Sequence, residues 1–174
     1  MSGREAFLTM ALSQRGRCVH ADGSTKYGTW FGDQVHSPAY DDGDFCAMGL
    51  LWCADQTGQL AVLGGVDKAW AWVPSWWQHW KKIGRSSKTA ARGRIVFFDF
   101  NRSGDPEHVG ACLKDNGNGT ITTVEFNTLG GQCATRTRNK SDVLGYGDPA
   151  WPAVPAPPPT PTPVVRVGDS CWMG

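Results

Sequence analysis

The segment that most restricts the fold is a predicted hairpin in the second half of the chain. The runs "HVGACL" at 108–113 and "TITTVEFNT" at 120–128 flank the turn-like "KDNGNG" at 114–119. Asn-Gly is a strong signal for a tight turn between antiparallel strands, because the central residues of such turns need a positive φ. We therefore expect two adjacent antiparallel strands, and the β-branched and aromatic "RIVFFDF" at 94–100 predicts a third.

The first half of the chain carries helical patterns instead. Three segments combine an apolar run with helix-capping residues, at 3–14, 45–57 and 73–84. Their expected N-caps are Ser2, Asp44 and Ser75. The residues at 15–43 are rich in Gly, Asp and Ser, and we expect loops there. Helices followed by an antiparallel sheet indicate an α+β fold in which N-terminal helices pack on the sheet.

A change of composition near residue 148 divides the chain. The run "DPAWPAVPAPPPTPTP" predicts a semi-rigid, extended linker. We therefore expect a folded domain at 1–147, a Pro-rich linker at 148–163 and a C-terminal stub of unknown role at 164–174. The stub is short enough to be either an added edge strand or the first residues of a further module.

Charge and hydropathy argue against several classes of function. The formal net charge is +1, and no apolar stretch approaches the roughly 20 residues of a membrane span. We expect neither nucleic-acid binding nor membrane insertion. Lys and Arg gather at 81–94 and 136–140, which is typical of a solvated face and alternatively fits an anionic partner such as a cell-wall polymer. The N-terminal "MSGREAFLTMALSQRGR" has no clean apolar region, so we expect no signal peptide.

Neither the cysteines nor the acidic residues form a recognisable metal or disulfide pattern. The six cysteines are at positions 18, 46, 53, 112, 133 and 171, without a CxxC pair or His–Cys metal spacing. We expect reduced thiols, with Cys53 and Cys112 as packing residues. The acidic residues at 41–44 do not have the spacing of a calcium site. The run at 99–105 resembles the start of a calcium loop, but Gly110 stands where a bidentate Glu is needed. We expect no metal and no cofactor.

Five of the nine tryptophans lie within residues 70–80. A sugar-binding aromatic platform is one interpretation. Packing of a short helix against the core is the other, and it is favoured because tryptophan is large and normally mostly buried.

The hairpin also brings together two groups that can act on a proton. If its turn is centred on residues 116–117, His108 lies directly opposite Glu125. Opposed residues have Cβ atoms about 4.5–5.5 Å apart, so the carboxylate can hold the imidazole in one tautomer. A shift of two residues would keep them diagonal neighbours, and an odd shift would separate them. Asn127 is expected on the same face, because side chains alternate along a strand.

Cys46 is the candidate nucleophile. It falls in the first turn of the helix predicted at 45–57, where the helix dipole and a nearby imidazolium stabilise a thiolate. Attack by a cysteine, proton transfer by a histidine, and an acid or amide that orients the histidine make up one form of the catalytic triad. A small buried hydrophobe is the alternative interpretation. The order of helix cysteine, sheet histidine and sheet orienter is that of papain-like folds.

Six motifs resemble, in the same order, those of CHAP domains, which are papain-like cysteine hydrolases of bacterial and phage cell-wall lysis. They are "YGTWFG" (27–32), "FCAMGLLWCADQTG" (45–58), "VPSWWQHWKKIGR" (73–85), "RIVFFDF" (94–100), "HVGACL" (108–113) and "GNGTITTVEFNT" (117–128). The resemblance covers roughly residues 5–130 and implies a papain-like CHAP fold, with residues 1–147 as the catalytic domain.

By the family's motif, Cys46 corresponds to the nucleophile, His108 to the base, Glu125 to the third member and Asn127 to a supporting polar residue. The resemblance implies a peptidoglycan hydrolase that cleaves amide bonds in cell-wall peptides. It would act as an endopeptidase or as an N-acetylmuramoyl-L-alanine amidase. Two positions depart from the family pattern: Arg94 follows Gly93 where Gly-Asp is frequent, and Gly49 stands where a larger apolar residue is common.

The Pro-rich linker is similar to that of an actinobacterial phage endolysin. Because no signal peptide is expected, such an enzyme would accumulate in the host cytoplasm before lysis and then act on bacterial peptidoglycan at the cell wall. We expect a monomer. Two alternatives from other classes remain, a non-catalytic wall-binding module and a virion-associated structural protein.

Overall fold

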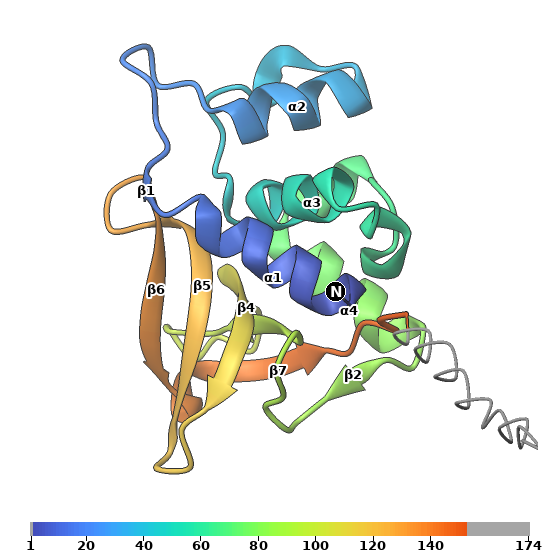
Figure 1. The fold of residues 1–174 in the computed structure, drawn as a ribbon, viewed down its shortest axis with the longest axis vertical. Coiled ribbons are helices and arrows are strands. Elements are labelled where there is room, and N and C mark those ends of the chain that lie inside the picture. The colour runs from blue at the N-terminus through green and yellow to red at the C-terminus, as the bar shows by residue number, and fades with distance from the viewer. Residues whose placement is uncertain (1, 153–174) are drawn as a thin grey trace, which may run out of the picture.

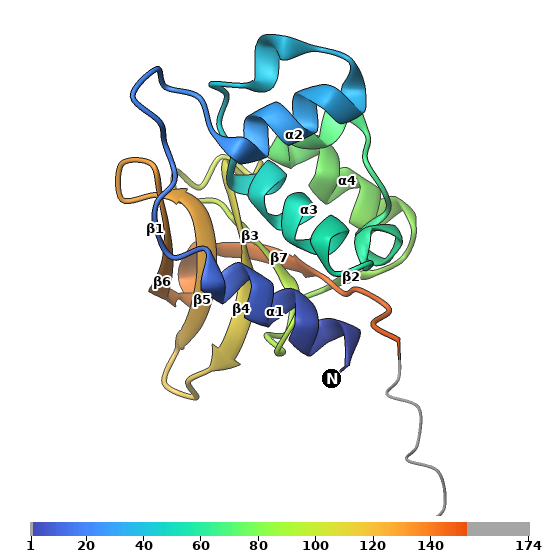
Figure 2. The same ribbon diagram turned by 45° about the horizontal axis from the view of Figure 1, so that its top comes forward.

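The computed structural model describes residues 2–152, and it confirms the α+β class. Four helices lie over one side of a strongly twisted sheet (Figures 1 and 2), and they are α1 (Gly3–Ser13), α2 (Lys26–Val35), α3 (Cys46–Gln56) and α4 (Val73–Lys82). The rest of the expected linker, 153–163, and the expected stub, 164–174, lie outside the described residues.

The sheet is antiparallel, with the strand order β1-β6-β5-β4-β3-β7-β2. Its strands are β1 (Gly16–Arg17), β2 (Ser86–Ser87), β3 (Ile95–Phe98), β4 (His108–Asp115), β5 (Thr120–Thr128), β6 (Gln132–Asn139) and β7 (Val143–Gly147). The three predicted strands are confirmed as β3, β4 and β5. The chain continues into β6, and β7 then returns across the sheet to pair with β3. The strands after β3 therefore do not form a simple meander, because β7 pairs with β3 and not with its sequence neighbour β6.

The expectation of loops throughout 15–43 is wrong, because α2 occupies Lys26–Val35. The side chain of Thr25 caps this helix by accepting a hydrogen bond from the Gly28 N–H at 2.9 Å. A Cβ atom at Gly28 would overlap the backbone of Tyr40 and Asp41. The glycine therefore permits close packing inside a helix, although in sequence it resembles a helix breaker.

Only one of the three expected helix caps is present. Ser2 caps α1 as expected, by accepting a hydrogen bond from the backbone of its first turn. The expectation for Asp44 is wrong, because Phe45 occupies the cap position of α3 without a side-chain hydrogen bond. Ser75 lies inside α4, whose cap position is Trp72.

The turn between β4 and β5 is longer than expected. The Asn116 N–H donates to the carbonyl of Thr120 at 3.1 Å, so residues 117–119 form a three-residue loop. Gly117 and Gly119 both have a positive φ there. This loop alone would shift the pairing by an odd number of residues, and a bulge further along the ladder, between 112 and 114, takes one residue of that offset back.

The expected register is therefore wrong by two residues. Glu125 pairs with Gly110, and His108 lies opposite Phe98 of β3. Because side chains alternate with a period of two, this shift leaves His108 and Glu125 on the same face as diagonal neighbours.

Buried side chains cover both faces of the sheet. The cluster under the helices includes the strand residues Ile95, Phe97, Val109, Ala111, Val124 and Phe126. A smaller cluster on the other face consists of Val96, Phe98, Cys112, Ile121 and Tyr146. This alternation explains why "IVFF" is an unbroken apolar run: each residue of β3 is buried on one face or the other.

The packing interpretation of the tryptophan cluster is confirmed for four of its five members. Trp70, Trp76, Trp77 and Trp80 are buried, with exposed fractions of 0–7%. The rings of Trp76 and Trp77 lie 5.8 and 5.2 Å from Phe97, which fixes α4 on the sheet. Trp72 is different, because 66% of it is exposed.

The chain beyond residue 147 is fastened to the domain. Arg94 forms a two-pronged ion pair with Asp148, at 3.1 and 3.2 Å. Trp151 stacks on Phe7 at 5.1 Å, and its indole N–H donates to the carbonyl of Gly93 at 3.1 Å. Arg94, which departs from the family pattern, thus holds the end of β7 in place.

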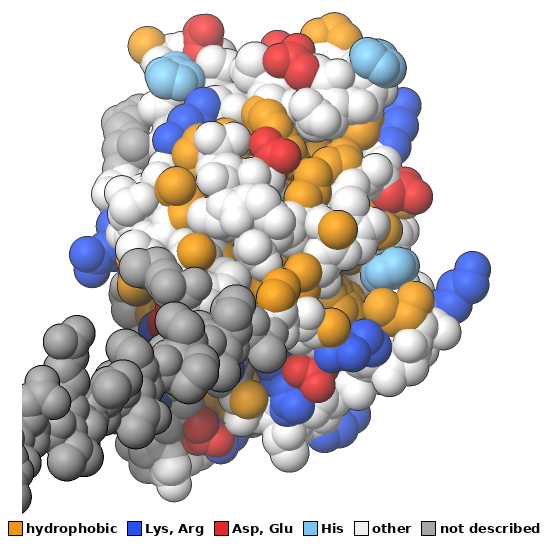
Figure 3. All heavy atoms as spheres, turned by 45° about the vertical axis from the view of Figure 1, so that its right-hand side comes forward, with side chains coloured by type: hydrophobic (Ala, Val, Ile, Leu, Met, Phe, Trp, Pro, Cys, Tyr) orange, Lys and Arg blue, Asp and Glu red, His pale blue; other side chains and the backbone are white. Residues whose placement is uncertain are grey.

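None of the helices in the described part is long and apolar enough to cross a membrane. On the face seen from the right of Figure 1, Lys and Arg side chains occur singly or in small groups, and several lie next to Asp or Glu (Figure 3).

Gly49 generates a prediction about stability, because it lies where α3 crosses β5. A Cβ atom there would overlap the ring of Phe126 and approach its Cβ atom to 2.8 Å. We expect Gly49→Ala to lower the free energy of unfolding by about 1 kcal/mol or more, since overpacking costs about 1–3 kcal/mol and outweighs the gain in helix propensity. Urea unfolding measures this. Phe126→Leu should recover part of the loss when combined with Gly49→Ala, and a more stable Gly49→Ala protein would contradict the packing argument.

Candidate active site

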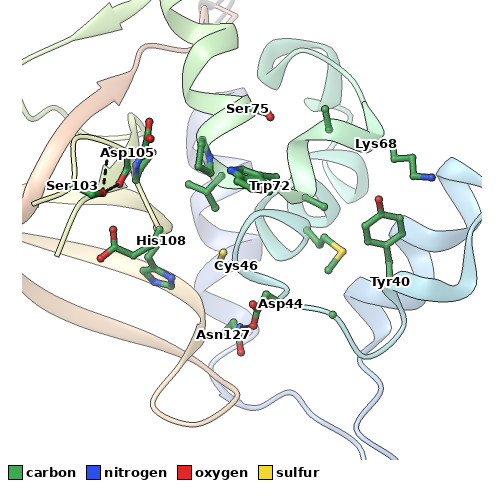
Figure 4. A pocket seen from close by; sticks show the side chains of 18 of the residues that line it. Tyr40, Asp44, Cys46, Lys68, Trp72, Ser75, Ser103, Asp105, His108 and Asn127 are labelled. Atoms are coloured by element: carbon green, nitrogen blue, oxygen red, sulfur yellow. Dashed lines mark hydrogen bonds between the residues drawn. The ribbon is translucent and has the colours of Figure 1, made fainter. Parts of the chain in front are cut away.

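A groove of about 920 Å³ opens where the N-terminus of α3 faces the start of β4. The rest of its lining comes from segments that are distant in sequence, at 39–44, 68–75 and 101–107, and from Asn127 of β5. Figure 4 shows Cys46 near the centre, with His108 on the sheet side, Trp72 above, and Tyr40 and Lys68 on the far wall. Its volume is in the range typical of small-ligand and peptide sites.

Cys46 is the first residue of α3 and is 4% exposed. It nevertheless lines the groove, so its sulfur is reachable from there (Figure 4). The first-turn N–H groups of a helix have no acceptor within the helix, and they carry the positive end of its dipole. The sulfur is therefore held where a negative charge is favoured.

His108 begins β4 and is oriented on two sides. Its Nε2 atom lies 3.0 Å from Glu125 Oε2, and its ring stacks on Phe98 at 5.8 Å. Since Nε2 is engaged by Glu125, Nδ1 is the nitrogen left for Cys46. Burial lowers the pKa of His108, but hydrogen bonds to Cys46 and Glu125 and the charges of both raise it to about 9.

Glu125 is completely buried in the middle of β5. Thr123 Oγ1 donates to Oε1 at 2.6 Å, and Arg138 of β6 donates to Oε1 at 3.0 Å and to Oε2 at 2.6 Å. Burial raises the pKa of this carboxyl, but the hydrogen bonds from His108, Arg138 and Thr123 lower it to about 2. The group is therefore ionised at every pH at which His108 titrates.

Gly110 makes room for the Glu125 side chain. A Cβ atom at this position would lie 2.7 Å from Glu125 Cγ, well inside van der Waals contact. Because the two residues are paired across the ladder, the missing side chain lets Glu125 lean toward His108 two residues along β4. With glycine at this position, the diagonal neighbours His108 and Glu125 come close enough to form a hydrogen bond.

Asn127 lies elsewhere than its spacing suggests. A register shift between Glu125 and Thr128 interrupts the alternation of β5, and Asn127 itself has a φ of 50°. Its side-chain N–H donates to Asp44 Oδ1 at 2.8 Å, and both residues line the groove (Figure 4). The structure thus brings Cys46, His108 and Glu125 together, whereas Asn127 lines the same groove but is bonded to Asp44.

Three further thiols of the described residues belong to the packing. Cys53, Cys112 and Cys133 are buried outside the groove, and burial raises the pKa of each. Within residues 2–152 no group of three or more His, Cys, Asp or Glu residues is arranged to hold a metal ion.

Arg138 and Gly110 are members of the site that no sequence motif indicates. Arg138 belongs to the basic run at 136–140, which fits either a solvated face or an anionic partner. The alternating "TRTRN" of β6 carried a usable signal, because a period of two places Arg136 and Arg138 on the face shared with Glu125.

The CHAP domain family matches residues 36–127, a range that begins before α3 and ends at Asn127. The comparison with curated proteins found no match, and neither did the comparison with solved structures. Because the family match covers more than half of the 174 residues, the chain belongs to the CHAP domain family.

Proposed function

We propose that the protein is a peptidoglycan hydrolase that cleaves amide bonds of cell-wall peptides by a Cys46–His108–Glu125 thiol mechanism. CHAP domains are generally cysteine amidases or peptidases, and this supports the reaction class. The observation that carries the proposal is the meeting of Cys46 of α3 and His108 of β4 at one groove, with the buried Glu125 of β5 hydrogen-bonded to His108.

In the first half of the reaction, the Cys46 thiolate attacks the carbonyl carbon of the scissile amide. The carbon–nitrogen bond breaks, and the His108 imidazolium gives its proton to the leaving amine. A thioester between Cys46 and the acyl part of the substrate remains. The raised pKa of His108, about 9, keeps the imidazolium available near neutral pH.

In the second half, His108 takes a proton from a water molecule as that water attacks the thioester. The carbon–sulfur bond breaks, the acid product leaves, and His108 and Cys46 return to their starting states. Glu125 stays a carboxylate throughout and holds the Nε2–H of His108. The backbone N–H of Cys46 is a donor for the developing oxyanion, and a second donor would come from the 27–44 segment, where Tyr40 lines the groove.

The groove suits a peptide that carries charges of both signs. Lys68 lies on one wall, whereas Asp44 and Asp105 line other parts of it (Figure 4). Stem peptides of peptidoglycan hold both carboxylates and amines, so these side chains support binding of that substrate class. Endopeptidase and amidase activity both fit this chemistry, because the scissile bond depends on how loops seat the substrate.

An endolysin role is part of the proposal, with accumulation in the host cytoplasm before action at the wall. The order of motifs and the Pro-rich run after the domain support it. A non-catalytic wall-binding module would have no need of a buried carboxylate that orients a histidine beside a thiol. A virion-associated protein carrying the same domain would use the same chemistry from outside the cell.

The thiol mechanism predicts that Cys46→Ala abolishes the release of muropeptides from purified walls and leaves the fold intact, since it removes one small side chain. Mass spectrometry of the products measures this and also identifies the bond: new free N-termini indicate an endopeptidase, and sugar-free stems indicate an amidase. Cys18→Ala, at a thiol outside the groove, is the matched control and should stay active. Wall hydrolysis by folded Cys46→Ala protein would refute the mechanism.

The triad geometry predicts that Glu125→Gln lowers turnover strongly, by roughly 10²–10⁴-fold. The substitution removes the charge that stabilises the imidazolium and leaves the Arg138 cation without its partner. Iodoacetamide alkylation of Cys46, followed by mass spectrometry near neutral pH, should also slow, and His108→Ala should slow it further. The double variant should be little worse than His108→Ala, because the two residues act as a unit. Independent, multiplying effects in folded proteins would show that the pairing does not serve the thiol.

The exposed ring of Trp72 predicts a contribution to substrate binding that is separate from the catalytic step. It lines the groove with two-thirds of its surface exposed, unlike the four buried tryptophans around it. We expect Trp72→Ala to raise KM for wall substrate by about tenfold with a much smaller effect on kcat, because the ring offers a flat apolar surface and no acid–base group. Ile83→Ala, at an exposed apolar residue outside the groove, should leave both constants unchanged. An unchanged KM in Trp72→Ala would contradict this assignment.

A further inference from the structure

Arg138 of β6 forms two hydrogen bonds with the buried Glu125, whereas an arginine on a solvated strand surface would point into water. Its Nε donates to Glu125 Oε1 at 3.0 Å and its Nη2 donates to Oε2 at 2.6 Å, while 18% of its side chain is exposed. A two-bond contact between a guanidinium and a carboxylate adds a fixed direction to the energy of the ion pair. Arg138 is therefore a direct partner of the group that orients His108.

The hydrogen bonds to Glu125 fix its orientation. Oε1 accepts from Thr123 and Arg138, and Oε2 accepts from Arg138 and faces His108 Nε2. A carboxylate held only by His108 would be free to rotate about its last side-chain bond. Two bonds from the planar guanidinium remove that freedom and leave one lone pair of Oε2 directed at the imidazole.

An aromatic pair covers this assembly on its outer side. The guanidinium carbon of Arg138 lies 5.5 Å from the ring centroid of Phe98 and 4.9 Å from that of Phe100. The two rings stack on each other at 5.3 Å with an interplanar angle of 7°, and His108 stacks on Phe98. Both the base and the arginine thus rest on one aromatic surface that limits access of water, and electrostatic interactions are stronger where water is excluded.

We propose that Arg138 is a positioning residue of the thiol site: it keeps Glu125 ionised and directed at His108 Nε2 in both protonation states of the histidine. This inference rests on the proposed function. In the reaction, His108 alternates between imidazolium and imidazole. When it is neutral, Glu125 would be a buried carboxylate without a countercharge, which is costly, and Arg138 supplies the permanent one.

The titratable groups that face His108 and Arg138 come from three segments: α3, β5 and the short turn before β7. Cys46 of α3 and Glu125 of β5 face His108, and Glu125 and Asp142 face Arg138. Arg138 is a fixed cation within this set, so its removal should raise the pKa of the His108 imidazolium. A residue with a merely structural role would not move this pKa.

The test compares Arg138→Met, Arg138→Lys and the matched control Arg136→Met. Arg136 lies two residues earlier on β6, and its buried Nε has no hydrogen-bond partner among the described residues. Two pH profiles are measured for each folded variant and the wild type: kcat/KM on purified wall, and the rate of Cys46 alkylation by iodoacetamide, resolved by mass spectrometry. Circular dichroism and the thermal midpoint report folding.

We expect the basic limb of the Arg138→Met activity profile, and the step of its alkylation profile at which His108 loses its proton, to move to higher pH. Turnover should fall by up to about a hundredfold, because the imidazole is no longer held in place. Arg138→Lys should keep the limbs close to those of wild type and lose part of the turnover, since it retains the charge and loses the fork. Arg136→Met should match wild type in both measurements.

Unchanged limbs and turnover in folded Arg138→Met would overturn the proposal, and so would equal losses in Arg138→Met and Arg136→Met. If Arg138→Met does not fold, a wild-type turnover of Arg138→Lys would overturn it as well, because the fork would then be dispensable. The alkylation profile needs no wall substrate. A wild-type protein that leaves walls intact but shows the Arg138-dependent step in its alkylation profile would refute the proposed substrate and support the positioning role.

Discussion

The site depends on the burial of one carboxylate. Glu125 is wholly removed from solvent, and an unpaired buried charge costs several kcal/mol, so the fold has to surround it with donors. Three adjacent strands provide them: His108 from β4, Thr123 from β5 itself and Arg138 from β6. Gly110 leaves the space through which the side chain reaches the histidine. The strand pairing that builds the sheet therefore also builds the acid–base part of the site.

The nucleophile comes from the other layer, so its position depends on how closely the helices approach the sheet. Gly49 lets α3 rest directly on the ring of Phe126, one residue after Glu125 on β5. Four buried tryptophans fix α4 and the segment before it on the same side. This packing directs the N-terminus of α3, with Cys46, toward the end of β4 and leaves the groove between them. A helix cysteine and a sheet histidine meet because the two layers are rigid and closely packed.

Much of the fold could be predicted because its signals are local. The apolar runs and the turn residues of 114–119 predicted β3, β4 and β5, and the helical patterns predicted α1, α3 and α4. The errors fall where tertiary contacts override local preference. Helix α2 contains glycines that suggest a loop, yet Gly28 is required for contact with a neighbouring backbone. The hairpin register was two residues off because a bulge and a three-residue loop cannot be distinguished from a tight Asn-Gly turn by composition.

The sequence by itself determined which chemical groups the site contains: a cysteine at a helix start, and a histidine and a glutamate on adjacent strands, where a shift of two residues does not change the face. Only the tertiary structure decided their partners. It directed Asn127 to Asp44 through a break in β5, and it joined Arg138 to Glu125 across β6. The physical reason is the distance in sequence over which each effect acts. Helix and strand periodicities act within one element. An ion pair or a close glycine contact forms only after separate elements have packed together.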